Sequence, residues 1–262
     1  MSLVENTLFG IRDKVEIAIA RLREFEPEEG YYLAFSGGKD SQCIYHLAVK
    51  AGVKFDAHFN LTTVDPPELI KFIKAQYPDV AIHKPPVTMW KLIPQKLMPP
   101  TRRVRYCCEY LKEHGGAGRM VVTGIRWAES ARRSKRQVFE QCMKAKHKTF
   151  IHPIIDWSTP DVWEYIKSRN LPYCSLYDEG QTRIGCILCP MQSKKARTRD
   201  IKRYPTYYRA YLRAFEKMLA ERNKRGFETT MWNTAQDVMD WWIHGNADNG
   251  CNGNPDQTAL FE

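Results

Sequence analysis

Short apolar runs alternate with amphipathic segments along the first 190 residues of the chain. Four of the runs have the length and composition of buried strands, namely residues 31–35, 55–61, 80–83 and 120–123. Segments with helical character separate these runs. Because strands that alternate with helices favour parallel pairing, we predict an α/β fold with a mostly parallel sheet and helices on both faces.

Four helices are predicted among these strands, over residues 4–25, 42–50, 66–77 and 159–169. Gly52 is expected to end the second helix, since glycine readily adopts the left-handed conformation of a helix C-terminus. Pro66 and Pro160 lie where the third and fourth helices begin, and proline is well tolerated in a first helical turn.

The pattern changes after Cys189. A strongly basic run at residues 194–203 is followed by helical spacing at residues 207–223 and 232–243. The stretch 245–255 is rich in Gly, Asn and Asp, which predicts a loop or a disordered tail. We therefore predict an α/β domain over residues 1–190 and a helical C-terminal extension over residues 191–262.

Length and composition agree with a folded protein that has a core, because 43% of the 262 residues are hydrophobic and 27% are charged. No apolar run reaches the roughly 18 residues that a membrane span needs, so no membrane partner is expected. Residues 1–10 lack the basic start and apolar stretch of a secretory signal, and a cytoplasmic location is therefore expected.

The formal net charge is +10, from 40 basic and 30 acidic residues. A surface of this sign attracts nucleic acids and small anions. A generally basic protein without a nucleic-acid partner has the same composition, so the charge alone leaves both interpretations open.

A Ser-Gly-Gly-Lys-Asp-Ser loop at residues 36–41 connects a predicted strand to a predicted helix. Gly37 and Gly38 can adopt backbone angles closed to other residues, and neither places a Cβ in the path of a ligand. The N–H groups of such a loop and of the first helical turn converge on an anion. The spacing is not that of a Walker loop. The alternative is an ordinary Gly-Gly turn with an Asp cap.

The other side chains of the loop have complementary predicted roles. Ser36 and Ser41 add hydroxyl donors, and Lys39 adds a positive charge. Asp40 either caps the helix or helps to hold Mg²⁺ on a nucleotide. The loop is therefore a candidate site for phosphate groups.

The chain has eight cysteines, and four of them form two close pairs, Cys107 with Cys108 and Cys186 with Cys189. Four thiolates gathered in this way can hold zinc or an iron–sulfur cluster. In a chain without a predicted secretory signal, clustered cysteines indicate metal or redox chemistry rather than disulfides. Three others are predicted to be structural: Cys43, Cys142 and Cys174.

Residues 35–41 resemble the PP-loop of the adenine-nucleotide α-hydrolase superfamily. That superfamily includes N-type ATP pyrophosphatases, tRNA-thiolating enzymes and phosphoadenylyl-sulfate (PAPS) reductases. The resemblance implies a Rossmann-like sheet with an adenine nucleotide beside the loop, either ATP with Mg²⁺ or adenylyl sulfate (APS) or PAPS. It also implies that residues 36–41 bind this nucleotide and that Lys39 and Asp40 take part in catalysis.

Three further segments are similar to PAPS and APS reductases, namely residues 123–130, 156–163 and 176–190. They imply that Gly124 and Arg126 contact the nucleotide and that Arg126 takes part in catalysis. The cluster-bearing members of the family hold a [4Fe–4S] centre with a Cys-Cys pair and a CxxC pair. Carried over residue by residue, this implies that the ligands are Cys107, Cys108, Cys186 and Cys189.

Two features differ from those of the reductases. Assimilatory reductases carry a C-terminal Glu-Cys-Gly-(Leu/Ile)-His motif, whereas Cys251 lies in Asn-Gly-Cys-Asn-Gly. Cys251 is therefore interpreted as a tail cysteine, with a mobile nucleophile as the alternative. The reductases often have a degraded PP-loop, whereas this loop is complete, as it is in members that split ATP.

These differences favour ATP-dependent adenylylation with release of pyrophosphate, coupled to sulfur transfer onto a nucleic acid or another acceptor. The cluster-containing protein of the DNA phosphorothioation system resembles this plan, and a cysteine desulfurase is the expected sulfur donor. Reduction of APS or PAPS to sulfite, with a thioredoxin-like electron donor, is the first alternative. A non-catalytic nucleotide and Fe–S partner subunit is the second.

Overall fold

A computed structural model describes residues 3–8, 10–113, 115–141, 148–227 and 231–244 of the chain. The contacts divide it into two compact units. The first unit comprises Met1–Asn60, Pro67–His83 and Gly115–Ile184, and the second comprises Leu61–Pro66, Lys84–His114 and Gly185–Glu262. Both units combine segments that lie far apart in the sequence. The domain boundary predicted at residue 190 stays a prediction.

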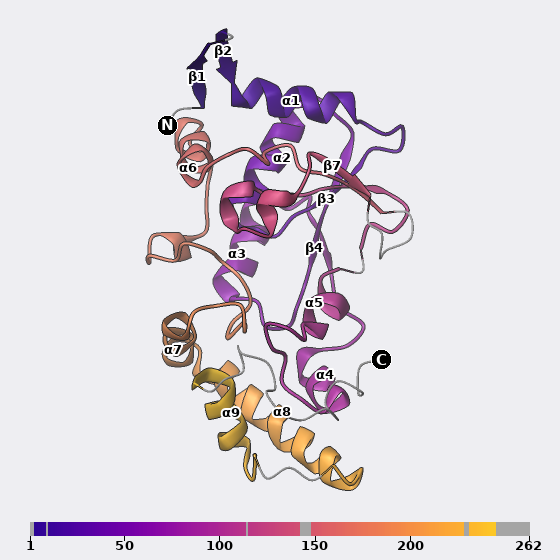
Figure 1. Cartoon of the computed structure of the whole chain (residues 1–262), viewed down its shortest axis with the longest axis vertical. Helices are drawn as coiled ribbons and strands as arrows, with labels where there is room; N and C mark the ends of the chain where they lie inside the picture. Colours follow the sequence, from indigo (N-terminus) through magenta and orange to yellow (C-terminus); the bar gives the residue numbers. More distant parts are fainter. Residues whose placement is uncertain (1–2, 9, 114, 142–147, 228–230, 245–262) are drawn as a thin grey trace. The chain divides into compact units, whose positions relative to one another are not determined.

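The first unit is built on a six-stranded sheet with the order β5-β4-β3-β6-β8-β7 (Figure 1). The strands are β3 (Tyr31–Ala34), β4 (Phe55–Asn60), β5 (Ala81–His83), β6 (Met120–Val122), β7 (Phe139–Gln141) and β8 (Thr149–Ile151). Every pair is parallel except β7 with β8. The predicted α/β fold and its four predicted strands are confirmed, whereas β7 and β8 were not predicted.

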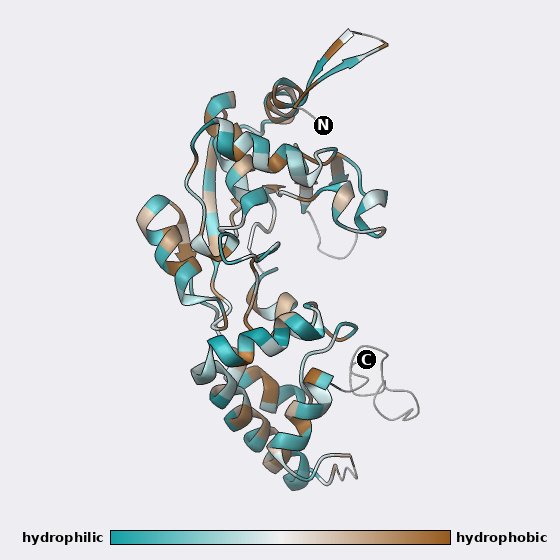
Figure 2. Ribbon diagram, turned by 90° about the vertical axis from the view of Figure 1, so that its left-hand side faces the viewer, coloured by the Kyte–Doolittle hydropathy of each residue, from teal (hydrophilic) through white to brown (hydrophobic). Residues whose placement is uncertain are grey.

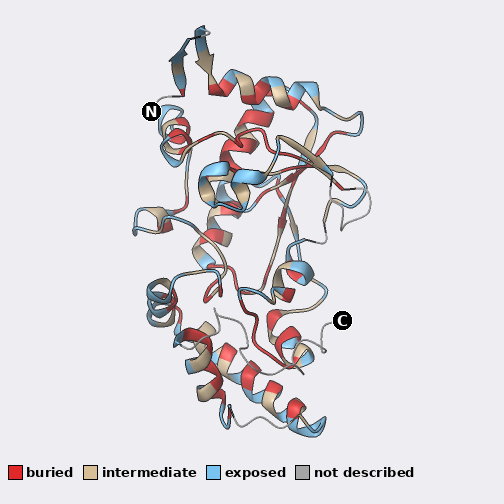
Figure 3. Cartoon of the chain, in the orientation of Figure 1, coloured by how far each residue is buried: buried red, intermediate tan, exposed pale blue. Residues whose placement is uncertain are grey.

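The helices of the first unit are α1 (Lys14–Glu24), α2 (Lys39–Ala51), α3 (Pro67–Gln76) and α6 (Thr159–Ser168). Gly52 ends α2 in the left-handed conformation with a φ of 72°, as predicted. Ser158 and Asp161 form a capping box at the start of α6, next to the proline of its first turn. Much of α2 is buried (Figure 3), which fixes the helix that follows the Ser-Gly-Gly loop.

The helix predicted over residues 4–25 is wrong for its first ten residues. Residues 4–7 and 10–13 instead pair as an antiparallel hairpin of β1 (Val4–Thr7) and β2 (Gly10–Asp13). The helix begins only at Lys14, because the Asp13 carboxylate accepts the N–H groups of Val15 and Glu16. Leu8 is fully exposed in the hairpin, so its helical spacing carried no information about burial.

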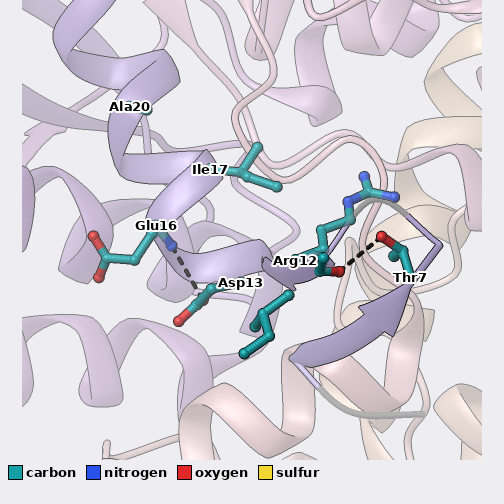
Figure 4. Close-up of a pocket in the computed structure, with 8 residues that line it drawn as sticks. Thr7, Arg12, Asp13, Glu16, Ile17 and Ala20 are labelled. Carbon is teal, nitrogen blue, oxygen red and sulfur yellow. Dashed lines mark hydrogen bonds between the residues drawn. The ribbon is translucent and has the colours of Figure 1, made fainter.

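Beside this hairpin the surface has a hollow of about 630 Å³ (Figure 4). The Thr7 hydroxyl donates to the Gly10 carbonyl across the turn, 2.8 Å away. Arg12 on the second strand forms an ion pair with Asp156, which ties the hairpin to the rest of the first unit.

The second unit is helical, with α4 (Met89–Lys96), α5 (Tyr106–Leu111), α7 (Lys194–Arg203), α8 (Pro205–Lys224) and α9 (Ala235–His244). The longest helix, α8, packs against both α4 and α9. Its apolar residues alternate with hydrophilic stretches (Figure 2), and Tyr211, Phe215 and Met218 are fully buried in the core of this unit. The two predicted C-terminal helices are confirmed. The tail predicted at residues 245–255 lies outside the described residues.

Three helices of this unit were not predicted, namely α4, α5 and α7. The helix α4 contains Pro94, and α7 is almost entirely polar, so neither has a clear apolar pattern. Within the described residues, no helix combines the length and apolar character that crossing a membrane requires.

Candidate functional site

The Ser-Gly-Gly loop leaves the carboxyl end of β3 and enters α2. Strand β3 pairs with β4 on one side and with β6 on the other, so the order of the strands reverses at this point. Open parallel sheets bind ligands at such a switch point, outside the carboxyl ends of their strands. The topology therefore places the predicted phosphate loop at the position where this class of fold holds ligands.

The two glycines of the loop have different roles. Gly37 has a φ of +70°, and a methyl group added there would lie 2.7 Å from Cδ1 of Ile73, so the fold itself requires glycine. Gly38 has a φ of −81°, which any residue adopts. A methyl group at Gly38 would have its nearest neighbours at 3.4 Å and 3.5 Å, in the Tyr177 hydroxyl and the Ser36 hydroxyl. Among the described residues, the neighbours within 4 Å of such a methyl group are thus two hydroxyls at van der Waals distance, so a small group fits there without a clash.

Hydrogen bonds inside the loop hold its backbone. Ser41 Oγ donates to the Gly38 carbonyl at 2.8 Å, and Ser36 Oγ donates to Ser41 Oγ at 3.2 Å. The fully buried Gln42 donates from Nε2 to the Gly37 carbonyl at 3.0 Å. Gln42 was not predicted, and only its position one residue after the loop could have indicated it. These bonds form the loop before a ligand arrives.

Asp40 lies between two cations. Lys39 Nζ is 3.1 Å from one carboxylate oxygen, and Arg126 Nε is 2.7 Å from the other. Both basic residues are buried, Arg126 with only 2% of its surface exposed. Gly38 is the N-cap residue of α2, so Asp40 lies inside the first turn and does not cap the helix. The two cations together fix the carboxylate at the start of α2.

Arg126 is further held by the carbonyl of Trp157 at 3.2 Å and by Thr159 Oγ1 at 3.5 Å. Its guanidinium is therefore directed at Asp40 and at the start of α6. The predicted contact of Arg126 with the nucleotide stays a prediction. Gly124 lies next to the same turn, because a Cβ there would come within 3.0 Å of the Asp40 backbone. The loop after β6 can pack this closely on α2 only with glycine at that position.

His152 is a further buried polar residue that was not predicted. Its Nδ1 lies 2.7 Å from the Thr123 hydroxyl at the end of β6, and its Nε2 lies 3.3 Å from the guanidinium of Arg136. Burial, helped by the charge of Arg136, lowers the pKa of His152 to about 4. The imidazole is therefore neutral and fixes the Thr123 hydroxyl. In the sequence, the one indication of this role was the position of His152 directly after β8.

The four clustered cysteines all belong to the second unit. Cys107 and Cys108 lie in the first turn of α5, and Cys186 lies 3.5 Å from the Thr62 hydroxyl. A hydrogen bond between the paired thiols lowers the pKa of Cys108 to about 6 and raises that of Cys107. Burial raises the pKa of Cys189 to about 11. The proximity of Cys186 and Cys189 also raises the pKa of Cys107, so the structure brings the two pairs close to each other.

Among the described residues, no group of three or more His, Cys, Asp or Glu side chains has the arrangement that holds a metal ion. Cys43 and Cys174 are fully buried, as expected of structural cysteines. Cys142 and Cys251 lie outside the residues that the structure describes.

The sequence model of the phosphoadenosine phosphosulfate reductase domain matches residues 30–192, more than half of the chain. The chain belongs to this family. The match includes the Ser-Gly-Gly loop, and it confirms the predicted membership of the PP-loop superfamily.

An adenosine 5'-phosphosulfate reductase of Oceanobacillus iheyensis is 34% identical over 52% of this chain and 58% of that protein. An uncharacterised protein of Methanocaldococcus jannaschii is 30% identical over 68% of this chain and 46% of that protein. The chain thus spans about half the length of these curated relatives. The crystal structure of a PAPS reductase from Candida auris superposes with a TM-score of 0.50 at 20% identity, covering 64% of this chain and 87% of the other, which shows a shared fold.

Proposed function

We propose that the chain binds ATP with Mg²⁺ at its PP-loop and transfers the adenylyl group to an acceptor oxygen, which sulfur then replaces. The observation that supports this most is the complete loop, in which Gly38 has no side chain and the hydroxyls of Tyr177 and Ser36 are the nearest groups to the place of its missing Cβ. Hydroxyl donors at the N-terminus of a helix suit an anion with several oxygens. A pyrophosphate leaving group is such an anion.

In the proposed reaction the acceptor oxygen attacks the α-phosphorus of ATP, and the bond to the pyrophosphate oxygen breaks. Lys39 would neutralise the charge that develops on the leaving group. Asp40, oriented by Arg126, would bind the Mg²⁺ that ATP brings. A sulfur nucleophile then forms a bond to the activated atom of the acceptor, and AMP leaves with the former acceptor oxygen.

We further propose that Cys107, Cys108, Cys186 and Cys189 hold a [4Fe–4S] cluster. Their four thiols belong to one unit, and Cys107 and Cys108 are hydrogen-bonded to each other, which fits a set of sulfur ligands. Such a cluster, when bound, supplies iron that can carry sulfur or electrons. The expected sulfur donor is a cysteine desulfurase.

A nucleic acid is the acceptor that the basic composition favours. The net charge is +10, and α7 carries six Lys and Arg residues against one Asp. A cytoplasmic location belongs to the same proposal. The composition fits other acceptors as well, so the acceptor has to be tested separately from the adenylyl transfer.

A second candidate is the reduction of APS or PAPS to sulfite with electrons from a thioredoxin-like donor. It is favoured by the APS reductase that is 34% identical to this chain. Both activities need the nucleotide at the PP-loop, and they differ in whether ATP or APS is consumed. A non-catalytic nucleotide and Fe–S partner subunit would bind without turnover.

Pyrophosphate release from ATP, measured with tRNA and DNA as acceptors, tests the proposal against the alternatives. Anaerobically purified protein should release pyrophosphate in an acceptor-dependent manner, and the Asp40→Ala variant should not. Sulfite formed from APS without ATP consumption would instead establish the reductase. Iron and sulfide analysis of the same sample tests the cluster, since a colourless protein with one zinc per chain would exclude it.

A further inference from the structure

The hydroxyl of Tyr177 lies on the PP-loop. The N–H of Lys39, the first residue of α2, donates to this hydroxyl at 2.9 Å. The first N–H groups of a helix have no partner inside the helix and are the groups that bind anions. A tyrosine from a distant part of the first unit thus touches the loop at the point where a phosphate oxygen would bind.

The ring of Tyr177 is held by its neighbours. It ends the short 3-10 helix η3 (Ser175–Tyr177), and its ring packs edge-on against Trp163 of α6 with centroids 5.0 Å apart. Tyr173 packs against the same ring at 6.4 Å. The Thr182 carbonyl, five residues further along the chain, lies 3.5 Å from Lys39 Nζ. The aromatic contacts present the hydroxyl to the loop in a fixed position.

The hydroxyl retains an unused donor. Its oxygen accepts the N–H of Lys39, but within the described residues its own proton has no acceptor. Burial raises the pKa of Tyr177, so the phenol keeps its proton and remains a donor at neutral pH. A hydroxyl in this state is complementary to a phosphate oxygen.

The place of the missing Gly38 side chain lies directly beside this hydroxyl. A methyl group at Gly38 would be 3.4 Å from it and 3.5 Å from Ser36 Oγ. An atom seated there would be within reach of both hydroxyls. The backbone of Gly38 does not require glycine, and the missing side chain leaves room for a ligand atom beside both hydroxyls.

We propose that Tyr177 is a phosphate-positioning residue, whose hydroxyl is held by the Lys39 N–H and donates to a phosphate oxygen of the nucleotide over Gly38. This inference rests on the proposed binding of a nucleotide at the PP-loop. Tyr177 would thereby fix the nucleotide before the chemical step. The opposite reading is that its hydroxyl blocks the loop and has to leave, and this reading predicts an effect of opposite sign.

The test compares Tyr177→Phe with Tyr173→Phe by calorimetric titration of the full chain with ATP and Mg²⁺. Tyr173 is a matched control, because its ring belongs to the same cluster and its hydroxyl bonds to Asp178 instead of the loop. Tyr177→Phe should bind ATP at least about 10-fold more weakly, because the variant lacks a hydrogen bond to a charged phosphate group. Tyr173→Phe should bind as the wild type does.

A second readout separates a ligand contact from a structural role. The ³¹P resonance of one phosphate of bound ATP should differ between wild type and Tyr177→Phe and should be unchanged in Tyr173→Phe. Equal affinities, or tighter binding by Tyr177→Phe, would overturn the inference while leaving nucleotide binding intact. If the wild type bound neither ATP nor APS, the proposed function would fail together with it.

Discussion

Replacing each glycine of the PP-loop by alanine separates folding from binding. Alanine at Gly37 would have to adopt a φ of +70°, which costs an L-residue about 1–2 kcal/mol. Its methyl group would also lie 2.7 Å from Ile73, which adds about 1–3 kcal/mol of overpacking. The free energy of unfolding of Gly37→Ala should therefore fall by about 2–5 kcal/mol.

Alanine at Gly38 should leave the stability almost unchanged. Alanine is a poorer N-cap residue than glycine, which costs about 0.5–1 kcal/mol. It also restricts the unfolded chain, which stabilises the fold by about 0.4–1 kcal/mol. The two effects nearly cancel, and no atom lies closer than 3.4 Å to the new methyl group. The methyl group nonetheless fills the space for the phosphate, so ATP affinity should fall at least about 10-fold.

Urea unfolding and calorimetric titration with ATP and Mg²⁺ measure both quantities on the same preparations. Gly37→Ala is expected to be destabilised, and Gly38→Ala is expected to be stable but defective in binding. The reasoning would be refuted if Gly38→Ala bound ATP like the wild type, or if it lost more than about 2 kcal/mol of stability, well above the combined cap and entropy effects.

Three further predictions concern other residues. Asp40→Ala leaves the buried guanidinium of Arg126 without its carboxylate and should cost about 2–3 kcal/mol, less than a fully buried pair; an Arg126→Met change in the same background should recover part of this loss in a double-mutant cycle. Because the pKa of His152 is lowered to about 4, its contribution to the free energy of unfolding should be complete above pH 6.5 and should fall by roughly 2–3 kcal/mol towards pH 4. A His152→Asn variant should lack this pH dependence in urea unfolding. Cys107→Ser should lose iron on anaerobic purification, whereas Cys174→Ser, in the first unit, should retain it, and equal iron contents would contradict the assigned ligands.

The order of strands and helices could be predicted because each element has a local signal. The strand at Tyr31–Ala34 is almost entirely buried and reads as a continuous apolar run. Gly52 likewise ends its helix through a property of glycine alone. The hairpin at residues 4–13 was missed because Leu8 and Ile11 imitate helical spacing while both are exposed. Exposure depends on tertiary contacts, which the spacing of residues does not contain.

The candidate site was predictable where its residues are contiguous and not where they come together through folding. The loop itself follows from its sequence, but the different demands on Gly37 and Gly38 depend on a backbone angle and on the neighbours of each residue. Tyr177 reaches the loop from 138 residues away along the chain. His152 likewise becomes notable only through its contact with Thr123.

A crystal structure of the chain with Mg²⁺ and a non-hydrolysable ATP analogue would examine the proposed nucleotide site itself. We expect the β- and γ-phosphates over Gly38, with one phosphate oxygen within about 3 Å of the Tyr177 hydroxyl. Asp40 should face the Mg²⁺. A triphosphate that lies away from residues 36–41, or crystals that take up APS but not the ATP analogue, would contradict ATP-dependent adenylyl transfer.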